Sequence, residues 1–539
     1  MRYGFVIDNR VCIGCHACTV ACKAEHLVPI GVNRTWVKYI EKGTYPDVRR
    51  HFQVTRCNHC EDAPCVTICP TSALFTRKDG IVDFDNRRCI GCKSCTQACP
   101  YDAIYIDPNN DTAAKCNFCA HRIEQGLNPS CVNVCPEQAI RYGDLDDPNS
   151  DISRLIATND ARARKPEAGT KPKLFYIESE SAALVPGATA TSPQSVWSSQ
   201  VRGVGHNEGV EGSQLDLLGI VRKAQVTHQT NTGNSSQALD GLLRELETAT
   251  GETKVRRAYD QPDKGVMWGW EVAAYIMTKA ISAGLGLIAA LTFLLPQLDI
   301  GAEMLGGVSG SDQTWLAAVA LLFLALTGGL LIKDLDRPDR FLYVLLRPQW
   351  NSWLVRGGYI ITAYGGLLSV WLLNALIFDD NGLFGALAWP LGFVALATAV
   401  YTAFLFKQAK GRDFWQSPLL VPHMLVHAPL AGCAVLSLVG YAPKELFIAC
   451  LIVNAAILIY EVCGKHKSKD AAETARSMES GKAGDIFRIY VILYGHILPM
   501  LWLLIPNLPL PMMAGVFVLI GMAVTEYLWV YLPQQRPNV

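Results

Sequence analysis

Sixteen cysteines between Cys12 and Cys135 fall into four groups of four, and their spacing constrains the fold more than any other feature. The groups are Cys12, Cys15, Cys18 and Cys22; Cys57, Cys60, Cys65 and Cys69; Cys89, Cys92, Cys95 and Cys99; and Cys116, Cys119, Cys131 and Cys135. Three closely spaced thiolates on a tight loop can bind three irons of a cubane, whereas the fourth faces away and completes a second cluster. The spacing therefore predicts four [4Fe-4S] clusters, with these sixteen cysteines as the iron ligands.

Two other uses of cysteine are disfavoured. An isolated C-x2-C pair also occurs in zinc sites, but here four sets are complete and three of them end in Cys-Pro. Disulfides are typical of exported chains. Because the cysteines begin at Cys12, we expect no cleavable signal peptide or twin-arginine leader.

Composition divides the protein into three parts. Residues 1–180 contain the cysteine groups and short strand-like pieces. Residues 181–265 are rich in Ser, Gly, Thr, Asn and Gln and predict a flexible linker, within which Gln237–Thr250 could form a short amphipathic helix. Residues 266–539 are strongly apolar. The formal net charge of zero gives no reason to expect nucleic acid as a partner.

The apolar part contains eight segments near the length of about 20 residues that crosses a bilayer. Their approximate spans are 268–295, 314–333, 353–378, 383–406, 416–440, 443–463, 485–506 and 509–532. We therefore expect an α+β iron–sulfur domain of two ferredoxin-like units, followed by an all-α membrane bundle of eight transmembrane helices.

Basic residues between these segments predict the orientation of the bundle. The short loops after segments one, three, five and seven contain a single basic residue, Lys444. The loops after segments two, four and six hold Lys333, Arg337, Arg340, Arg347, Lys407, Lys410, Arg412, Lys465, Lys467, Lys469, Arg476 and Lys482. This asymmetry predicts a multi-pass protein of the cell inner membrane with its iron–sulfur domain in the cytoplasm.

The cysteine-rich part resembles the four-cluster electron-transfer subunits of molybdenum oxidoreductases of the dimethyl sulfoxide reductase type. The resemblance rests on the four groups, including "CNHCEDAPCVTICP" and "CNFCAHRIEQGLNPSCVNVCP", and covers about residues 1–180. It implies that the first and fourth groups share two clusters and that the second and third groups share the other two.

The membrane part is similar to the quinone-reactive anchor of polysulfide reductase, the NrfD/PsrC type, over about residues 265–535. The similarity rests on "WGWEVAAYIMTKAISAG", "KDLDRPDRF" and "FWQSPLLVPHMLVHAPLAG". In many relatives the two parts are separate chains and the cluster domain faces the periplasm. Here the parts are fused, and the loop charges favour the cytoplasmic side.

Ionisable residues inside apolar segments are costly and usually functional. Glu271, His423, His427 and Glu526 lie in the halves of segments one, five and eight that the loop charges place toward the cytoplasm. We expect these four to bind a quinone headgroup and exchange its protons. The alternatives are an interfacial position for Glu271 and hydrogen bonds between helices for the histidines.

Lys279 in segment one and His496 in segment seven lie nearer the middle of the membrane. They are candidates for a proton path, and the alternative is a buried structural pair without a transport role. The i, i+4 histidines of segment five also suggest ligation of haem b. Two helices would have to supply opposed histidines for this, and His496 is the only obvious histidine on a second helix, so haem is disfavoured.

These features predict an electron-transfer and membrane-anchor subunit of a multi-subunit oxidoreductase. Clusters would pass electrons between a catalytic partner, a molybdopterin oxidoreductase by resemblance, and menaquinone or ubiquinone. No pterin-binding domain is recognisable, so substrate chemistry is expected on another chain. The alternatives are a conduit that couples electron flow to proton translocation and the quinone-reactive anchor of a hydrogenase.

Overall fold

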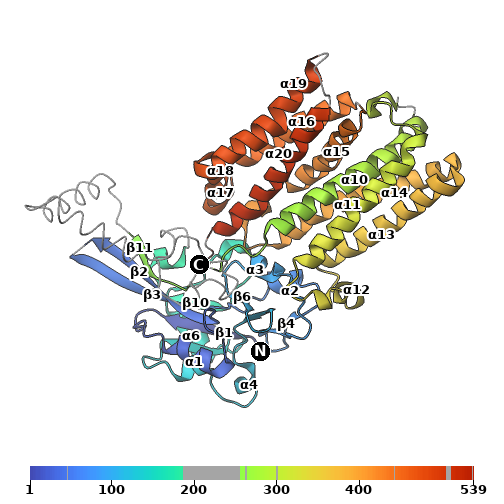
Figure 1. The fold of residues 1–539 in the computed structure, drawn as a ribbon. Coiled ribbons are helices and arrows are strands. Elements are labelled where there is room, and N and C mark those ends of the chain that lie inside the picture. The colour runs from blue at the N-terminus through green and yellow to red at the C-terminus, as the bar shows by residue number, and fades with distance from the viewer. Residues whose placement is uncertain are drawn as a thin grey trace, which may run out of the picture.

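The computed structural model describes residues 1–44, 46–185, 255–261, 264–298, 302–441, 443–505, 512–536 and 538. A cysteine-rich α+β domain lies against one end of a bundle of long helices (Figure 1). The predicted amphipathic helix Gln237–Thr250, most of the predicted linker and the boundary between the last two predicted spans lie outside the described residues.

Small sheets build the cysteine-rich domain. The largest has the strand order β8-β1-β10-β9, in which β1 pairs parallel with β10 and antiparallel with β8. Its strands are β1 Tyr3–Asp8, β8 Ile140–Asp144, β9 Ala161–Arg162 and β10 Leu174–Ile177. Phe5, Val6 and Ile7 are all buried, because β1 is an inner strand with side chains covered on both faces. Two hairpins, β4 Leu74–Thr76 with β5 Val82–Phe84 and β6 Ile104–Asp107 with β7 Thr112–Lys115, flank the cysteine loops.

A three-stranded sheet joins the cysteine-rich domain to the membrane part. It consists of the hairpin β2 Thr35–Thr44 and β3 Asp47–Arg56, with β11 Val255–Tyr259 paired to β2. Residues near the end of the predicted linker thus form a strand of the cysteine-rich domain, shortly before the first long helix begins.

Short helices carry many of the cysteines. They are α1 Ala17–His26, α2 Pro64–Ile68, α3 Ser94–Ala98 and α5 Ser130–Asn133, while α4 Ala120–Ile123, α6 Asp151–Thr158 and α7 Ser181–Leu184 carry none. The loops before α1 and α3 turn sharply, because Gly14 and Gly91 both have φ of 68°, which glycine adopts without steric cost.

Eight helical spans long and apolar enough to cross a membrane occur in the described residues, as the sequence predicts. They are 270–297, 310–333, 353–378, 381–408, 420–438, 444–463, 481–504 and 512–535. Their helices are α10 Trp270–Gln297, α11 Gln313–Lys333, α13 Trp353–Leu373, α14 Asn381–Gln408, α15 Leu420–Leu438, α16 Lys444–Cys463, α18 Gly481–Ile486 with α19 Leu498–Leu504, and α20 Met512–Tyr531. Two short helices, α12 Tyr343–Leu346 and α17 Lys469–Glu479, lie between spans.

Helices α10 and α15 form the centre of the bundle. In each, 72% of the most apolar stretch is buried, against 22% in α13. They cross at glycines: a Cβ on Gly284 would lie 2.0 Å from the carbonyl oxygen of Ala428, and one on Gly432 would lie 2.9 Å from the carbonyl carbon of Gly284. Small residues at such a crossing let two backbones approach closely.

The seventh span contains an irregular stretch. Residues Phe487–Ile497, between α18 and α19, form a π-helix that includes His496. Gly495 in this stretch packs directly against Gly521 of α20. π-Helical turns are rare and often occur at functional sites.

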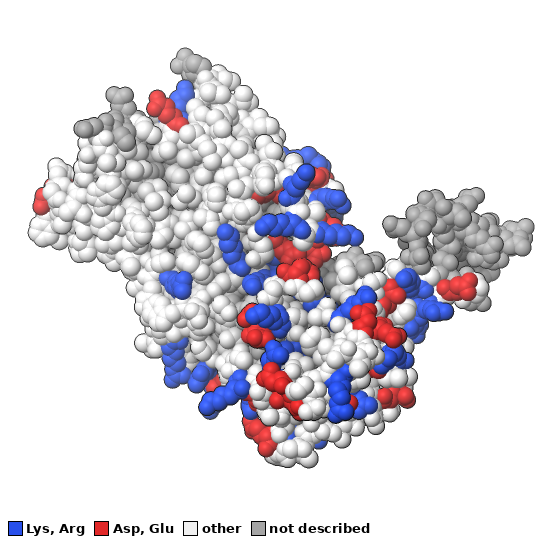
Figure 2. All heavy atoms as spheres, turned by 180° about the vertical axis from the view of Figure 1, so that it is seen from behind, with Lys and Arg blue, Asp and Glu red and all other residues white. Residues whose placement is uncertain are grey.

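The junction between the two parts is made of specific polar contacts. Gln97 Nε2 donates to Gln534 Oε1 over 2.8 Å. Two side chains of the membrane part donate to backbone carbonyls of the cysteine-rich domain: Trp268 Nε1 to Cys92 over 3.2 Å and Ser352 Oγ to Ile68 over 2.7 Å. Charged side chains cover the cysteine-rich domain and the junction, whereas most of the bundle surface in view is uncharged (Figure 2). This distribution fits a bundle surrounded by lipid.

Candidate functional site

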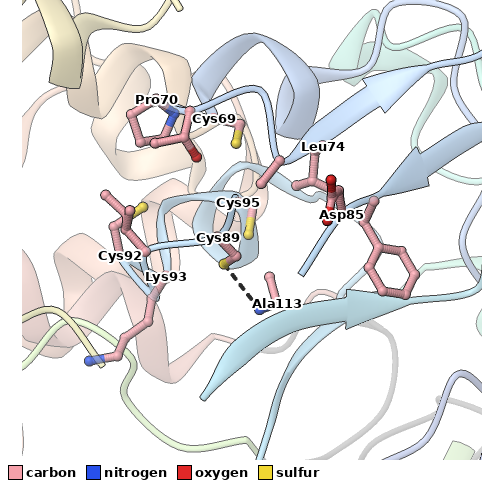
Figure 3. A pocket seen from close by; sticks show the side chains of 13 residues that line it. Cys69, Pro70, Leu74, Asp85, Cys89, Cys92, Lys93, Cys95 and Ala113 are labelled. Atoms are coloured by element: carbon pink, nitrogen blue, oxygen red, sulfur yellow. Dashed lines mark hydrogen bonds between the residues drawn. The ribbon is translucent and has the colours of Figure 1, made fainter. Parts of the chain in front are cut away.

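The cysteine cluster nearest the membrane combines two sequence groups. Cys69, Cys89, Cys92 and Cys95 line one cavity, and their sulfurs surround it (Figure 3). Cys69 follows α2, Cys95 lies in α3, and the other two lie in the loop before α3. The backbone N–H groups of Ala113 and Gly91 donate to Cys89 Sγ over 3.4 and 3.5 Å. We call this cluster the inner set.

A second cavity has the same plan at another place in the domain. It is lined by Cys12, Cys15 and Cys18 of the first group and by Cys135 of the fourth. Cys15 is exposed, so this set reaches the surface. We call it the outer set.

Proximity of the remaining thiols defines two further sets. Burial raises the pKa of the Cys22 thiol, and the neighbouring Cys116, Cys131 and Cys119 raise it further. Burial likewise raises the pKa of Cys60, helped by Cys57 and Cys99, and Cys65 lies beside the same two thiols. We call the set of Cys22, Cys116, Cys119 and Cys131 the second set and that of Cys57, Cys60, Cys65 and Cys99 the third set.

The four sets form a row. Cys18 of the outer set lies within electrostatic reach of Cys131 of the second set. Cys116 of the second set likewise lies within electrostatic reach of Cys57 of the third set. Cys65 of the third set lies within electrostatic reach of Cys95 of the inner set. The structure thus brings together the cysteines that the family resemblance pairs, and it orders the sets from the surface to the bundle.

The donor chemistry of the sets fits iron–sulfur clusters. Each set offers four thiols, and all nineteen cysteines of the protein are free. Burial keeps such thiols protonated unless a bound cation compensates the thiolate charge. Beside them, Arg56 Nε, Arg56 Nη2 and Asn58 Nδ2 are buried without a hydrogen-bond partner, and cluster sulfides would accept from such donors.

Glu271 lies at the membrane end of this row. It lies in the first turn of α10, and its carboxylate is 3.6 Å from Lys333 Nζ. Asp334 follows Lys333, and burial raises its pKa to about 7 against the lowering effect of Lys93. Lys93, next to Cys92 of the inner set, donates to the carbonyl of Asp334 over 2.9 Å. Glu271 therefore lies near the inner set, and no hydrogen bond or ion pair of the described residues joins it to the histidines.

The two histidines of α15 form a buried polar chain with two carboxylates. His423 Nδ1 is 2.8 Å from Glu461 Oε2 of α16, and His427 Nδ1 is 2.7 Å from Glu526 Oε1 of α20. The imidazole rings lie 4.2 Å apart, and all four side chains are at most 2% exposed. Such carboxylate–histidine pairs can hold a proton in apolar surroundings and pass it along.

Glu461 is the residue of this buried polar chain that sequence reasoning missed. It lies near the end of the sixth span, in "IYEVC", where a carboxylate is easily taken for an interfacial group. The signal that Glu461 shares with Glu526 is an acidic residue within an apolar segment.

Lys279, near the middle of the first span, continues the buried polar chain of histidines and carboxylates. Its Nζ donates to Thr402 Oγ1 over 2.6 Å and to the carbonyl of Ala399 over 2.9 Å, and it lies within electrostatic reach of Glu526. Glu271 and Lys279 are eight residues apart, which places them on the same face of α10.

His496 has other neighbours. Its Nε2 is 3.1 Å from Asn454 Nδ2, and its Nδ1 is 2.8 Å from the carbonyl of Val491. The structure therefore gives Lys279 and His496 different hydrogen-bond partners.

A cavity of about 380 Å³ opens beside Glu461. Ser417, Tyr460 and Glu461 line its membrane side, and Pro100, which follows Cys99 of the third set, lines the opposite side. Ser417 Oγ donates to Glu461 Oε1 over 3.1 Å. The cavity thus connects the surface of the junction with the carboxylate that begins the histidine chain.

Comparison with known proteins separates the same two parts. Residues 11–74 and 48–145 match 4Fe-4S dicluster domains, and residues 260–538 match "Polysulphide reductase, NrfD".

Relatives of known name match about one third of this protein. A tetrathionate reductase subunit of Salmonella typhimurium is 45% identical, with 34% of this protein and 76% of the relative covered. A polysulfide reductase chain of Wolinella succinogenes is 42% identical, with 33% and 94% covered. The arsenate respiratory reductase iron–sulfur subunit ArrB of a Shewanella species is 39% identical, with 33% and 97% covered.

Proposed function

The protein belongs to the polysulphide reductase NrfD family and fuses its membrane domain to iron–sulfur dicluster domains, and from this premise we propose that it transfers electrons between a catalytic redox partner and membrane quinones. The observation that carries this proposal is the row of four thiol sets between an exposed cysteine and the helical bundle.

Each set would hold one [4Fe-4S] cluster, four in all. When bound, these clusters pass single electrons. The protein supplies four thiolates per site, excludes water from most of them and sets the sites in a row. Exposure of Cys15 gives electrons an entry or exit at the outer set, and burial of the third set prevents loss to solvent.

The catalytic partner would bind over the outer set. Exposed apolar side chains lie in the outer-set loop and along α1: Ile13 is 54% exposed, Val20 64% and Leu27 86%. Exposed apolar residues gathered at one place mark interaction surfaces. Because relatives of the cysteine-rich part carry names of reductase subunits, the partner would be a catalytic reductase subunit. The resemblance of the four cysteine groups to subunits of molybdenum oxidoreductases supports a partner of the molybdopterin type.

The quinone would meet the electrons at the start of α10. Glu271 and Asp334 lie there, beside the inner set. A quinone takes up two electrons and two protons, so a headgroup in an apolar site needs proton donors. The chain of Lys279, Glu526, His427, His423 and Glu461 would supply them, with the cavity beside Glu461 as the connection to water.

The iron–sulfur domain would face the cytoplasm. Basic residues from the loops after the second and fourth spans contact this domain: Arg340 donates to the carbonyl of Cys89 and Arg412 to Gln97 Oε1. The cysteine-rich domain therefore lies on the side that carries the basic loops, and the positive-inside rule supports the cytoplasm as that side.

The test of this function is oxidation of prereduced, cluster-loaded protein by a soluble quinone analogue. Oxidation of all clusters on quinone addition supports the proposal, and clusters that stay reduced contradict it.

The buried chain also favours a second candidate, in which the same electron flow drives proton translocation. Lys279 and the two carboxylate–histidine pairs extend into the bundle farther than headgroup contact at Glu271 requires. Proton release on each side of proteoliposomes, counted per quinone turned over, separates the two candidates.

A further inference from the structure

Arg56 is a fully buried cation without a carboxylate partner. It ends β3, directly before Cys57, and none of its surface is exposed. Among the described residues no Asp or Glu forms an ion pair with it, and its guanidinium lies over the ring of Phe5 at 4.7 Å. Because an unpaired buried charge is costly, some other negative group must compensate it.

The compensating groups are cysteines. Arg56 Nη1 donates to Cys131 Sγ over 2.9 Å. Burial lowers the pKa of Arg56, but the nearby Cys131, Cys116 and Cys18 raise it by more. The guanidinium therefore lies between the outer and second sets, although the sequence places it beside a cysteine of the third.

A second side-chain nitrogen points at the same set. His26 Nε2 is 3.2 Å from Cys119 Sγ. The second set thus has ring or guanidinium nitrogens at two of its four sulfurs. At Cys89 of the inner set, the donors are the backbone N–H groups of Gly91 and Ala113.

Lys115 provides an internal comparison. "TRCNHC" and "AKCNFC" place Arg56 and Lys115 directly before the first cysteines of the second and fourth groups. Both side chains are completely buried. Lys115 Nζ, however, donates to the backbone carbonyls of Val82 and Cys116, and Cys65 of the third set is the thiol near it. The equivalent position therefore holds a cation that does not bond a thiol of the second set.

We propose that Arg56 raises the reduction potential of the cluster held by Cys22, Cys116, Cys119 and Cys131, so that an electron rests at this second position of the row. The inference depends on the proposed function, because it requires that these cysteines hold a cluster. Reduction adds one negative charge, and a fixed cation with an N–H donor at a ligand sulfur stabilises that charge. The electron comes from one neighbouring cluster and leaves to the other, so no bond is formed or broken.

Clusters and quinone carry different numbers of electrons. A quinone needs two electrons, whereas clusters pass one at a time. A cluster that stays reduced behind the third and inner sets keeps a second electron available inside the protein.

The experiment is a redox titration of the full-length, cluster-loaded protein followed by paramagnetic resonance. The signal of the second set is identified as the one lost in Cys116→Ser. In Arg56→Gln that signal should require a more reducing potential, by at least a tenfold change in its one-electron equilibrium, or about 59 mV. Arg56→Lys, which keeps the charge but loses the fork geometry, should shift it in the same direction by less.

Lys115→Gln is the matched control, since it also removes a buried cation one residue before a cysteine. Its main effect should be on the reduction potential of the cluster held by the third set. An unchanged second-set potential in both Arg56 variants overturns the proposal, as does an equal shift of all four signals. If Arg56→Gln does not assemble clusters, the Lys variant decides in the same way. Iron and sulfide analysis of the wild-type sample shows whether the clusters that the inference requires are present. Quinone-driven oxidation of the same sample tests the proposed function separately.

Discussion

His427 of α15 and Glu526 of α20 lie with Nδ1 and Oε1 2.7 Å apart, in a place where neither side chain is more than 2% exposed. His423 and Glu461 repeat the arrangement one helical turn away, at 2.8 Å. Two acid–histidine pairs with adjoining rings inside an apolar bundle are costly to bury, and this cost is explained if the pairs exchange protons with a substrate.

Replacement of His423 by Ala should slow quinone turnover by about tenfold or more, because a positioned proton donor commonly contributes 10²–10⁴-fold. All four clusters should remain assembled and reducible. Steady-state kinetics with a quinone analogue measures the first effect, and paramagnetic resonance the second.

His496→Ala is the control for that variant, because His496 is bonded to Asn454 and Val491 outside the two acid–histidine pairs. It should change proton coupling or stability more than the KM for quinone. Unchanged turnover in His423→Ala would remove the pairs from the quinone reaction.

The loaded protein should contain about sixteen irons and about sixteen acid-labile sulfides per chain, four of each per cubane. The four sets supply the thiolates that this number requires. Colorimetric iron and sulfide assays on the purified protein check the value. A result near twelve, or zinc in place of iron, would contradict the assignment of the four sets.

Cys99→Ser should damage the cluster of the third set. Cys99 follows Cys95 by four residues in sequence, yet its thiol lies with Cys57 and Cys60. Paramagnetic resonance should therefore show loss of the signal that Cys57→Ser also removes. Cys433→Ser, a buried cysteine of α15, should leave all signals intact. Damage confined to the signal that Cys89→Ser removes would mean that the sets are not shared in this way.

Asp334 should make stability depend on pH. Burial raises its pKa from 3.8 to about 7 in the folded protein, so the folded state binds more protons than the unfolded state between these values. The contribution of Asp334 to stability therefore falls as pH rises from about 4 to about 7 and is constant above that. Melting temperatures of wild type and Asp334→Asn in detergent should diverge over this range in favour of the Asn variant. A constant difference across the range would show that the carboxyl group has an ordinary pKa.

The sequence was sufficient for the features that depend on local spacing. The cysteine groups and the apolar segments are each recognisable within a short stretch of sequence. The eight predicted spans agree with the described helices to within a few residues. Contacts between distant segments were harder to predict. The nearness of Cys22 to Cys116 follows from tertiary packing, and spacing alone does not contain it.

Two features carried no recognisable signal. Val255–Tyr259 pairs with β2, although it lies at the end of a stretch with the composition of a linker. Its pairing depends on the free edge of β2, which a single-sequence pattern does not reveal. Gly495 of the π-helix Phe487–Ile497 packs closely on Gly521, which is likewise a tertiary contact.

The most direct test of the account is rapid mixing of dithionite-reduced, cluster-loaded protein with a quinone analogue, followed by the visible absorbance of the clusters. Wild type should be reoxidised by quinone, and Glu271→Gln should be reoxidised several-fold more slowly with the same iron content. Glu445→Gln, a change of an exposed carboxylate in the first turn of α16, should behave as wild type. Clusters that stay reduced after quinone is added to the wild-type protein would contradict electron transfer to quinone and, with it, the central claim.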